Sequence, residues 1–439
     1  MQGGRNDKLK MTIVMGFTLF ATWFGAGNVI FPPFVARQAG SGWVIADIGF
    51  LLTDVGLSVL AVWVTMTSHT HDIYGVVDKV GRVPGKIMVA AIVMCIGFGV
   101  GIPRTATVTY EMGVSRLLPD LPYWLFGLIF FGVVLLVTLR PSKVVDIVGN
   151  YLTPVLLIVL MVLIVKGIIS PIGEADGTPT VVPLREGLIS GYQTMDGLGP
   201  FLPCGILVAA AVAKGYKDQN EVSNMTVKAG IIAGSLLALV YSGLAYLGAT
   251  TSGISSFEGL DQAALLLAIV ESLMGNAGVV LLTVIVLLAC LTTAIGLTAI
   301  IAEYLEDLSG GRLKNKFLVC ATVGISYAVS NLGLSAIISL AVPILSVMYA
   351  PMIVLFLTGW MDHFVDCRTA GCFAAYAAFF TAVLDTIGVE IVSALPFANF
   401  GLGWIVPAVV AGIIGAVAGK LRPAQSGAYG KSSAEKQSA

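Results

Sequence analysis

Apolar stretches long enough to cross a lipid bilayer follow one another along the whole chain, separated by short polar loops. A transmembrane helix needs about 20 mostly apolar residues, whereas a membrane β-strand alternates apolar and polar positions over about 10 residues. The stretches here are continuous, so the pattern predicts helices. We predict twelve spans, at residues 11–38, 43–67, 86–116, 122–139, 143–168, 184–213, 226–250, 276–307, 316–331, 335–359, 371–391 and 401–419.

The composition agrees with lipid as the solvent. Charged residues make up 11% of the chain and hydrophobic residues 57%, which leaves too few polar side chains to cover a water-facing surface. The net charge is −1 with no basic patch, so a nucleic-acid partner is not expected. No phosphate-binding loop and no soluble domain is visible, so we expect neither an ATP-driven pump nor an ATPase partner. The sequence predicts an all-α polytopic membrane protein.

The distribution of Lys and Arg predicts the orientation of the spans. These residues resist translocation and collect in cytoplasmic loops, and here they occur in alternate loops, while the intervening loops are acidic. The pattern places both termini in the cytoplasm. The cationic loops contain Arg5, Lys8 and Lys10; Lys79, Arg82 and Lys86; Arg140 and Lys143; Lys214, Lys217 and Lys228; Arg312, Lys314 and Lys316; and Arg368.

The spans divide into two halves of five. Because five is an odd number, the second half enters the membrane from the opposite side, which predicts a 5+5 inverted repeat with two further helices. The predicted organisation is a cytoplasmic N-terminus at 1–10, a first repeat at 11–169, a second repeat at 183–359, helices 11 and 12 at 371–420 and a disordered cytoplasmic tail at 421–439.

The first span of each half is interrupted by glycine and proline, in FGAGNVIFPP at 24–33 and TMDGLGPFLPCG at 194–205. Close packing and a kink explain one isolated cluster, but a pair at equivalent positions is typical of the discontinuous helices of secondary transporters. Half-helix N-termini attract anions, and frayed C-termini offer carbonyls to cations. A ligand that carries both a carboxylate and an ammonium group suits such a pair of breaks.

Span 8 contains two neighbouring hydroxyls, Thr292 and Thr293, slightly cytoplasmic of the midplane. Hard oxygen ligands suit a small hard cation such as Na+. The alternative is that both threonines bond back to the preceding helical turn, which is common inside spans.

Several segments resemble the system II branched-chain amino acid carriers, the LIVCS or BrnQ-type family, and the resemblance runs through all twelve spans. It implies a LeuT-like inverted repeat of the amino acid-polyamine-cation superfamily, with helices 1 and 6 discontinuous. It also implies uptake of leucine, isoleucine and valine at a prokaryotic inner membrane, with Na+ as the coupling ion. The segments are FGAGNVIFPP, IPRTATVTYEMG, YLTPVLL, GYQTMDGL, LACLTTAIGLTAIIAEY and SNLGLSAIISLAVPIL.

The resemblance also implies roles for individual residues. Backbone N–H groups in span 1 hold the substrate carboxylate, and carbonyls at the break in span 6 hold its ammonium group. Aromatic and thioether side chains form the apolar pocket, for which lipid or helix contact is the alternative. Arg104 is predicted on a different ground, because a charge inside span 3 is costly and needs a reason: it pairs with a carboxylate or gates the outer side of the site, or it forms a structural pair. The predicted substrate residues are Gly25, Ala26, Gly27, Asn28, Asp196, Gly197, Phe20, Trp23, Met195, Phe201 and Arg104.

A Na+ site is implied in the same way, between span 1 and span 8. Its predicted ligands are the carbonyls of Ala21, Phe24 and Ala289 and the hydroxyls of Thr292 and Thr293.

These observations lead to a secondary active transporter that imports branched-chain amino acids by Na+ symport through alternating access. The alternatives are a proton-coupled carrier, which Asp196 would serve by protonation, and a carrier of another small apolar amino acid. An enzyme is disfavoured because the chain has three histidines, none of them inside a predicted span. A channel is disfavoured because no filter sequence or ring of like charge is visible.

Overall fold

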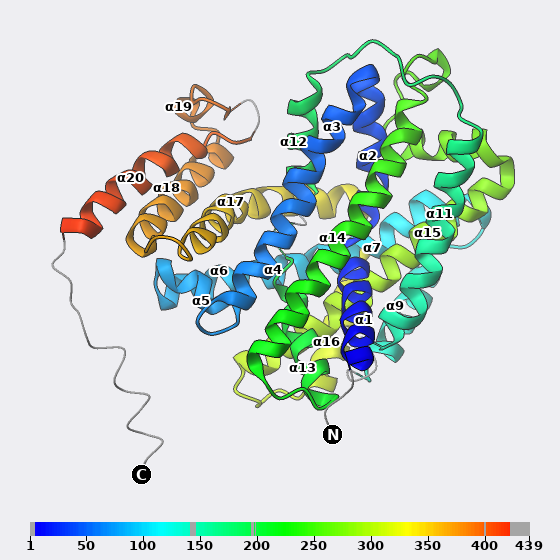
Figure 1. The fold of residues 1–439 in the computed structure, drawn as a ribbon. Helices are drawn as coiled ribbons and strands as arrows, with labels where there is room; N and C mark the ends of the chain where they lie inside the picture. Colours follow the sequence, from blue (N-terminus) through cyan, green and yellow to red (C-terminus); the bar gives the residue numbers. More distant parts are fainter. Residues whose placement is uncertain (1–4, 141–145, 195–196, 198, 399–400, 422–439) are drawn as a thin grey trace.

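The computed structural model describes residues 5–140, 146–194, 197, 199–398 and 401–421, and the regular secondary structure of this part is helical, with no β-strand (Figure 1). The longer helices are α1 (Arg5–Trp23), α2 (Ala26–Ala39), α3 (Trp43–Leu51), α4 (Leu57–Thr67), α6 (Arg82–Met94), α7 (Gly101–Thr109), α9 (Tyr123–Thr138), α11 (Thr153–Ile169), α12 (Pro183–Gln193), α13 (Leu202–Ala213), α14 (Gln219–Ala249), α15 (Gln262–Leu308), α16 (Asn315–Ser330), α17 (Leu334–Met361), α18 (Arg368–Ile387) and α20 (Ile405–Leu421).

Seven helical segments of the described chain are long and apolar enough to cross a membrane. Shorter apolar helices occur at Tyr123–Thr138, Leu202–Ala213 and Ile405–Gly419. The chain is therefore a multi-pass helical membrane protein, and the count of twelve spans stays a prediction. The seven segments are Gly27–Thr67, Arg82–Leu117, Val148–Ile169, Gln219–Ala249, Gln262–Leu308, Pro343–Met361 and Arg368–Ile387.

Helical segments also occur outside the predicted spans, and the longest of them precedes span 8. The chain from Gln262 onward is already helical, although span 8 was expected to begin at 276. The Asp261 side chain caps this helix by accepting a hydrogen bond from the Ala264 N–H at 2.8 Å. Gly275 has φ 58 and ψ −145, which bends the chain between this first part and the rest of α15.

The interrupted first helix lies in the interior of the bundle, where α1 and α2 follow one another end to end (Figure 1). Helix α14 packs against both of them, and α15 contacts both as well. Helix α12 packs closely on α3. At that contact a side chain on Gly187 would place its Cβ 1.9 Å from the Ala46 carbonyl oxygen, so only glycine allows the two backbones to approach. This packing brings the end of α12 next to the interior of the bundle.

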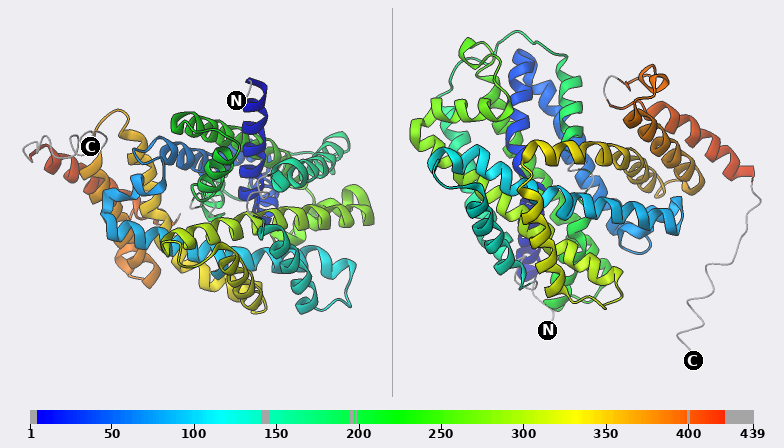
Figure 2. Two further views of the ribbon diagram at one scale, coloured as in Figure 1. Left: turned by 90° about the horizontal axis from the view of Figure 1, so that it is seen from below. Right: turned by 180° about the vertical axis from the view of Figure 1, so that it is seen from behind.

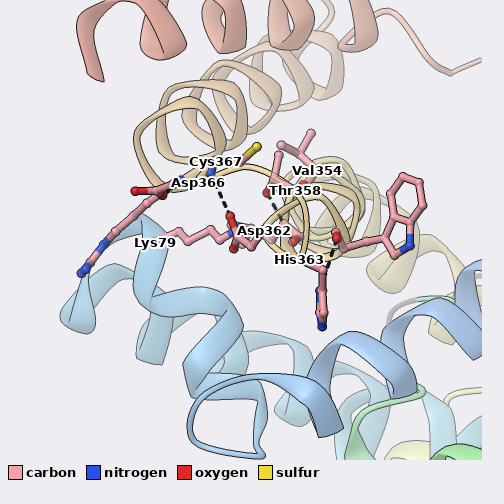
Figure 3. A network of polar contacts seen from close by, with 10 residues as sticks. Lys79, Val354, Thr358, Asp362, His363, Asp366 and Cys367 are labelled. Atoms are coloured by element: carbon pink, nitrogen blue, oxygen red, sulfur yellow. Dashed lines mark hydrogen bonds and ion pairs between the residues drawn. The ribbon is translucent and has the colours of Figure 1, made fainter. Parts of the chain in front are cut away.

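Helix α18 packs on both α20 and α17, and α18 and α20 lie to one side of the remaining bundle (Figures 1 and 2). Polar contacts near the end of α17 hold this region in place (Figure 3). The Lys79 ammonium pairs with the Asp362 carboxylate at 2.5 Å, and Asp362 also accepts a hydrogen bond from the Cys367 N–H at 2.9 Å. The Tyr376 hydroxyl donates to the Val80 carbonyl at 2.7 Å. Side chains near Lys79 therefore anchor both the end of α17 and α18.

We expect Asp362→Asn to destabilise the protein more than Lys79→Met. The Lys79 side chain is 7% exposed and that of Asp362 is 35% exposed, so Asp362→Asn leaves a buried ammonium without its counter-charge, whereas Lys79→Met removes the buried charge. Breaking a buried ion pair costs roughly 3–5 kcal/mol, and the partial exposure of Asp362 places this case at the lower end. The thermal unfolding midpoint of purified protein in detergent measures the difference. Equal midpoints for the two variants would contradict this ranking.

Candidate functional site

The first helix is broken at Phe24 and Gly25. The Phe24 N–H still donates to the Phe20 carbonyl at 2.7 Å, but the Gly25 N–H turns back to the Trp23 carbonyl at 3.0 Å. Gly25 is extended, with φ −96 and ψ −177, and α2 begins at the next residue. Because Gly25 does not donate to the Ala21 carbonyl, that oxygen is released from the helical pattern. The first turn of α2 in turn has N–H groups that no preceding helical turn can accept.

The second interruption lies between α12 and α13. Helix α12 ends at Gln193 and α13 begins at Leu202, so the intervening backbone is not α-helical where it is described. Two predicted substrate residues, Met195 and Asp196, lie outside the described residues. Gly197 is buried, and a Cβ placed on it would lie 2.5 Å from the Tyr349 hydroxyl oxygen.

The five oxygens predicted to bind Na+ lie together. The Thr293 hydroxyl is 3.1 Å from the Ala21 carbonyl and 3.2 Å from the Phe24 carbonyl. The Thr292 hydroxyl is 3.3 Å from the Ala21 carbonyl and 3.0 Å from the Ala289 carbonyl. The bond from Thr292 to Ala289 is the local back-bond considered as an alternative. Thr293, however, faces the broken end of α1, so its hydroxyl serves a different helix.

The donor set of this cluster fits a small monovalent cation. The hydroxyls of Thr292 and Thr293 carry one proton each but make four close contacts with carbonyl oxygens. Hydrogen bonds therefore do not use all the carbonyl lone pairs, and the remaining lone pairs are available to a cation. Both threonines are buried, at 0% and 8% exposure, and none of the five ligands carries a charge. A divalent ion would lack charge compensation here, whereas Na+ fits such neutral oxygens.

A cavity of about 1150 Å³ adjoins the break in the first helix. This volume exceeds the roughly 300–1,000 Å³ of a closed ligand pocket, so it describes a vestibule that includes the site. Its lining extends to Arg116, at the outer end of predicted span 3, to Asp261, between predicted spans 7 and 8, and to Trp404, just before α20. Of the predicted residues, the lining includes Trp23, Gly25, Gly27, Asn28, Arg104 and Thr293.

Arg104 lies directly at the start of α2. A Cβ on Gly27 would be 3.2 Å from an Arg104 Nη atom and 3.6 Å from the Phe31 ring. Arg104 is on α7, so helix packing brings its guanidinium to the same place as the N–H groups of the α2 first turn. Both groups favour an anion, the guanidinium through charge-assisted hydrogen bonds and the helix N-terminus through its dipole. A carboxylate at this position is within reach of both.

The predicted aromatic pocket is only partly present. Trp23 lines the cavity and is 4% exposed. Phe20 does not line it and instead stacks on Phe24, with ring centroids 5.2 Å apart. Phe201 also lies outside the lining and packs against Phe356 at 6.3 Å. The residues that turn toward the cavity depend on helix rotation, which the pattern of apolar residues does not specify.

The cavity lining also includes residues that were not among the predicted site residues, and Phe31 and Thr194 are two of them. Both lie in the two segments rich in glycine and proline, at 24–33 and 194–205. An aromatic or hydroxyl residue close to a predicted break is the sequence feature that could have identified them. Asp54 and Tyr241 were not selected either, although they lie next to the site. A charged residue inside a predicted span was the signal for Asp54.

A family model for branched-chain amino acid transport proteins matches residues 8–422. The chain is 35% identical over 429 residues to the branched-chain amino acid permease BraB of Bacillus subtilis, covering 93% of this chain and 95% of the relative. It is 36% identical over 424 residues to the branched-chain amino acid transport system 2 carrier protein of Pseudomonas aeruginosa, covering 93% and 96%. The permease BrnQ of Escherichia coli is 35% identical over 416 residues, with 91% and 93% covered.

Solved structures share the fold at low sequence identity. A Na+-coupled sialic acid symporter in a substrate-bound outward-open state superposes with a TM-score of 0.67 at 13% identity, covering 92% of this chain and 89% of the symporter. A nucleobase-cation-symport-1 family transporter in a closed conformation superposes with a TM-score of 0.52 at 14% identity, covering 92% of each chain. The fold is therefore that of LeuT-like secondary transporters.

Proposed function

Because the chain belongs to the family of branched-chain amino acid transport proteins, we propose that it imports leucine, isoleucine and valine by Na+ symport across a prokaryotic inner membrane. The family and the relatives are transport proteins, so the chain is a transporter and not an enzyme. The observation that carries the proposal of Na+ is the contact of the Thr293 hydroxyl with the Ala21 and Phe24 carbonyls, next to the break that faces the cavity.

Each end of the amino acid has a complementary group. The carboxylate binds the first turn of α2, around Ala26, Gly27 and Asn28, together with the Arg104 guanidinium. The ammonium group binds carbonyls at the break between α12 and α13, near Asp196 and Gly197. The apolar side chain contacts cavity residues such as Trp23. Backbone groups thereby bind the part that all amino acids share, and apolar contacts select the branched side chain.

Ion and substrate are coupled through one broken helix. The Ala21 and Phe24 carbonyls end α1, and the N–H groups that face the substrate begin α2 only a few residues later. Na+ bound to these carbonyls and to α15 fixes the position of the break and with it the direction of the α2 N–H groups. Binding of one ligand therefore favours binding of the other, and the coupling is reciprocal.

The proposed arrangement has twelve spans in two inverted repeats, at 11–169 and 183–359, with both termini in the cytoplasm. In this orientation the cavity lined by Arg116 and Asp261 faces outward. Alternating access then requires closure of this side and opening of the opposite side.

Uptake of labelled leucine into proteoliposomes tests the coupling ion. We expect an inward Na+ gradient at equal pH to drive accumulation, and an inward proton gradient without Na+ to give none. The cluster of neutral oxygens has no titrating group, which is the reason for this expectation. The proton-coupled alternative, with Asp196 as the carrier, predicts accumulation under the pH gradient alone, and that result would replace our proposal.

Leucine, isoleucine and valine should compete for one site, whereas lysine and glutamate should not compete. A missing methylene changes binding in an apolar pocket by only about 1–3 kcal/mol, so the three should differ modestly. The charged side chain of lysine or glutamate, in contrast, would have to lose its hydration in an apolar pocket. The strength with which each unlabelled amino acid inhibits uptake of labelled leucine measures the order of affinities. Efficient inhibition by glutamate would mean that the pocket has another specificity.

A further inference from the structure

Four buried polar side chains from four helical segments form a continuous chain of hydrogen bonds. The Asn28 amide of α2 donates to the Tyr241 hydroxyl of α14. The Tyr241 hydroxyl is hydrogen-bonded to the Asp54 carboxylate. The Thr194 hydroxyl, just after α12, donates to Asp54 Oδ1 at 2.7 Å. We call these four residues the polar bridge.

The polar bridge begins at one helix break and ends at the other. Asn28 lies in the first turn of α2, and its amide also contacts the Trp23 carbonyl on the far side of the first break, at 3.3 Å. Thr194 directly follows α12, where the second interruption begins. Both residues line the cavity. Asp54 and Tyr241 lie between them and are not part of the lining.

The centre of the polar bridge is fully enclosed. Asp54 is 1% exposed and Tyr241 is 0% exposed. The ion pairs found in the described part of the chain do not include Asp54, so hydroxyl donors alone satisfy its carboxylate there. An enclosed carboxylate without a cationic partner is unfavourable for stability. The presence of the Asp54 carboxylate at this enclosed position therefore points to a role in the binding site.

We propose that Asp54 is a positioning residue that, together with Tyr241, joins the two helix breaks so that the carboxylate and ammonium ends of the site form together. The proposal rests on the proposed function for the identity of the ligand. An amino acid needs both breaks at a fixed separation, and a path through two enclosed side chains joins Asn28 to Thr194. A shift of either break is thereby transmitted to the other.

The chemistry of each member suits this role. An ionised carboxylate accepts hydrogen bonds only, and both neighbouring hydroxyls can donate to it. The tyrosine hydroxyl can accept from Asn28 and donate to Asp54 at the same time. An asparagine at 54 would replace one carboxylate oxygen by an NH2 group, which cannot accept, so the two hydroxyls could no longer donate to separate side-chain oxygens of residue 54. The Thr194 hydroxyl also lies 2.7 Å from the Gly191 carbonyl, so Asp54→Asn would shift this hydroxyl toward its own helix. Asp54 also lies in a π-helical turn, Leu52–Gly56, a distortion that often occurs at functional sites.

A second aspartate of the same helical segment provides a matched control. Asp47 on α3 accepts a hydrogen bond from the Ser242 hydroxyl of α14 at 2.6 Å and is 8% exposed. The contact joins the same two segments through the same kind of donor, but neither residue lines the cavity. Asp47→Asn therefore measures the general effect of altering a buried aspartate between these helices.

Leucine binding and uptake by the purified, reconstituted protein test the proposal. We expect Asp54→Asn and Tyr241→Phe each to raise the leucine concentration for half-maximal uptake about tenfold or more, within the range of a lost buried hydrogen bond to a charged group. The Na+ concentration for half-maximal uptake, at saturating leucine, should change less than about twofold, because no member of the polar bridge is a Na+ ligand. Asp47→Asn should behave like wild type. A merely structural role would lower the amount of folded protein without separating the two constants.

A double-mutant cycle addresses the joining directly. Asn28→Ala and Thr194→Val remove the two ends of the polar bridge, so their effects on leucine affinity should be non-additive by roughly 3- to 30-fold. In the Asp54→Asn or Tyr241→Phe background the same two changes should be additive. Unchanged non-additivity in both backgrounds would overturn the proposal, and so would an Asp54→Asn protein that matches Asp47→Asn.

Wild-type uptake separates this test from the proposed function. If wild type accumulates no leucine with Na+, the proposed function fails. In that case the same double-mutant cycle is measured on the thermal unfolding midpoint of the protein without ligand. If the effects of Asn28→Ala and Thr194→Val become additive in the Tyr241→Phe background, the polar bridge is supported. If they stay non-additive there, the polar bridge is rejected.

Discussion

Replacing Gly27 by leucine should abolish leucine uptake while the protein still inserts and folds. The first side-chain carbon at this position would lie 3.2 Å from an Arg104 Nη atom and 3.6 Å from the Phe31 ring. The remaining leucine atoms would then occupy the part of the cavity where the α2 N–H groups and Arg104 meet the substrate carboxylate. Uptake into proteoliposomes, at equal amounts of folded protein, measures the loss.

A graded series makes this expectation sharper. In Gly27→Ala the crowded neighbour is the end of a flexible arginine side chain, which can move by a few tenths of an ångström, so we expect reduced but measurable uptake. Gly324→Leu is the matched control, because a Cβ at Gly324 meets no atom within 4 Å and the residue is exposed on α16. It should transport like wild type. Normal transport by Gly27→Leu would show that the carboxylate binds elsewhere.

Replacing Thr293 by alanine should raise the Na+ concentration needed for half-maximal uptake several-fold. The change removes one of five oxygens, and this hydroxyl is the one that contacts both the Ala21 and Phe24 carbonyls. Thr292→Ala should have a similar effect. Leucine affinity at saturating Na+ should change less, and by linkage Na+ should enhance leucine binding less in the variants. Initial uptake rates over a series of Na+ concentrations provide both constants.

Two further variants control for packing. Thr293→Ser keeps the hydroxyl and should keep most of the Na+ affinity. Thr283→Ala removes a buried hydroxyl from the same helix α15, but this hydroxyl bonds back to the Val279 carbonyl at 2.8 Å and has no role at the break. Its Na+ dependence should remain that of wild type. If instead uptake responds to pH alone and is indifferent to Na+ in wild type and in Thr293→Ala, both the ion and its ligands are misassigned.

Features that depend on local sequence were predictable in this protein. Continuous apolar stretches identify membrane helices because lipid requires every backbone group to bond within its own segment. Gly25 indicated where the first helix is interrupted, since glycine weakens the helical pattern, whereas Pro32 and Pro33 lie inside α2. The neighbouring hydroxyls of Thr292 and Thr293 were visible in the sequence of span 8. The resemblance to a carrier family supplied the carbonyls of Ala289, Ala21 and Phe24.

Features that depend on contacts between distant helices were not predictable. Helix rotation decides that Trp23 lines the cavity while Phe20 is packed inside, although both are aromatic residues of the same helix. The packing of α7 against α2 brings Arg104 to Gly27.

The sequence by itself determined the helices, their interruptions and the chemistry available at each break, because backbone bonding and hydrophobicity act over a few residues. Only the tertiary structure decided which side chains meet. Asp54 illustrates the difference, since its charge was visible in the sequence as an unexplained residue inside a span. Its partners Thr194 and Tyr241 belong to helices far along the chain, and a hydrogen bond requires atoms within about 3 Å of each other, a proximity that arises only when the helices have packed.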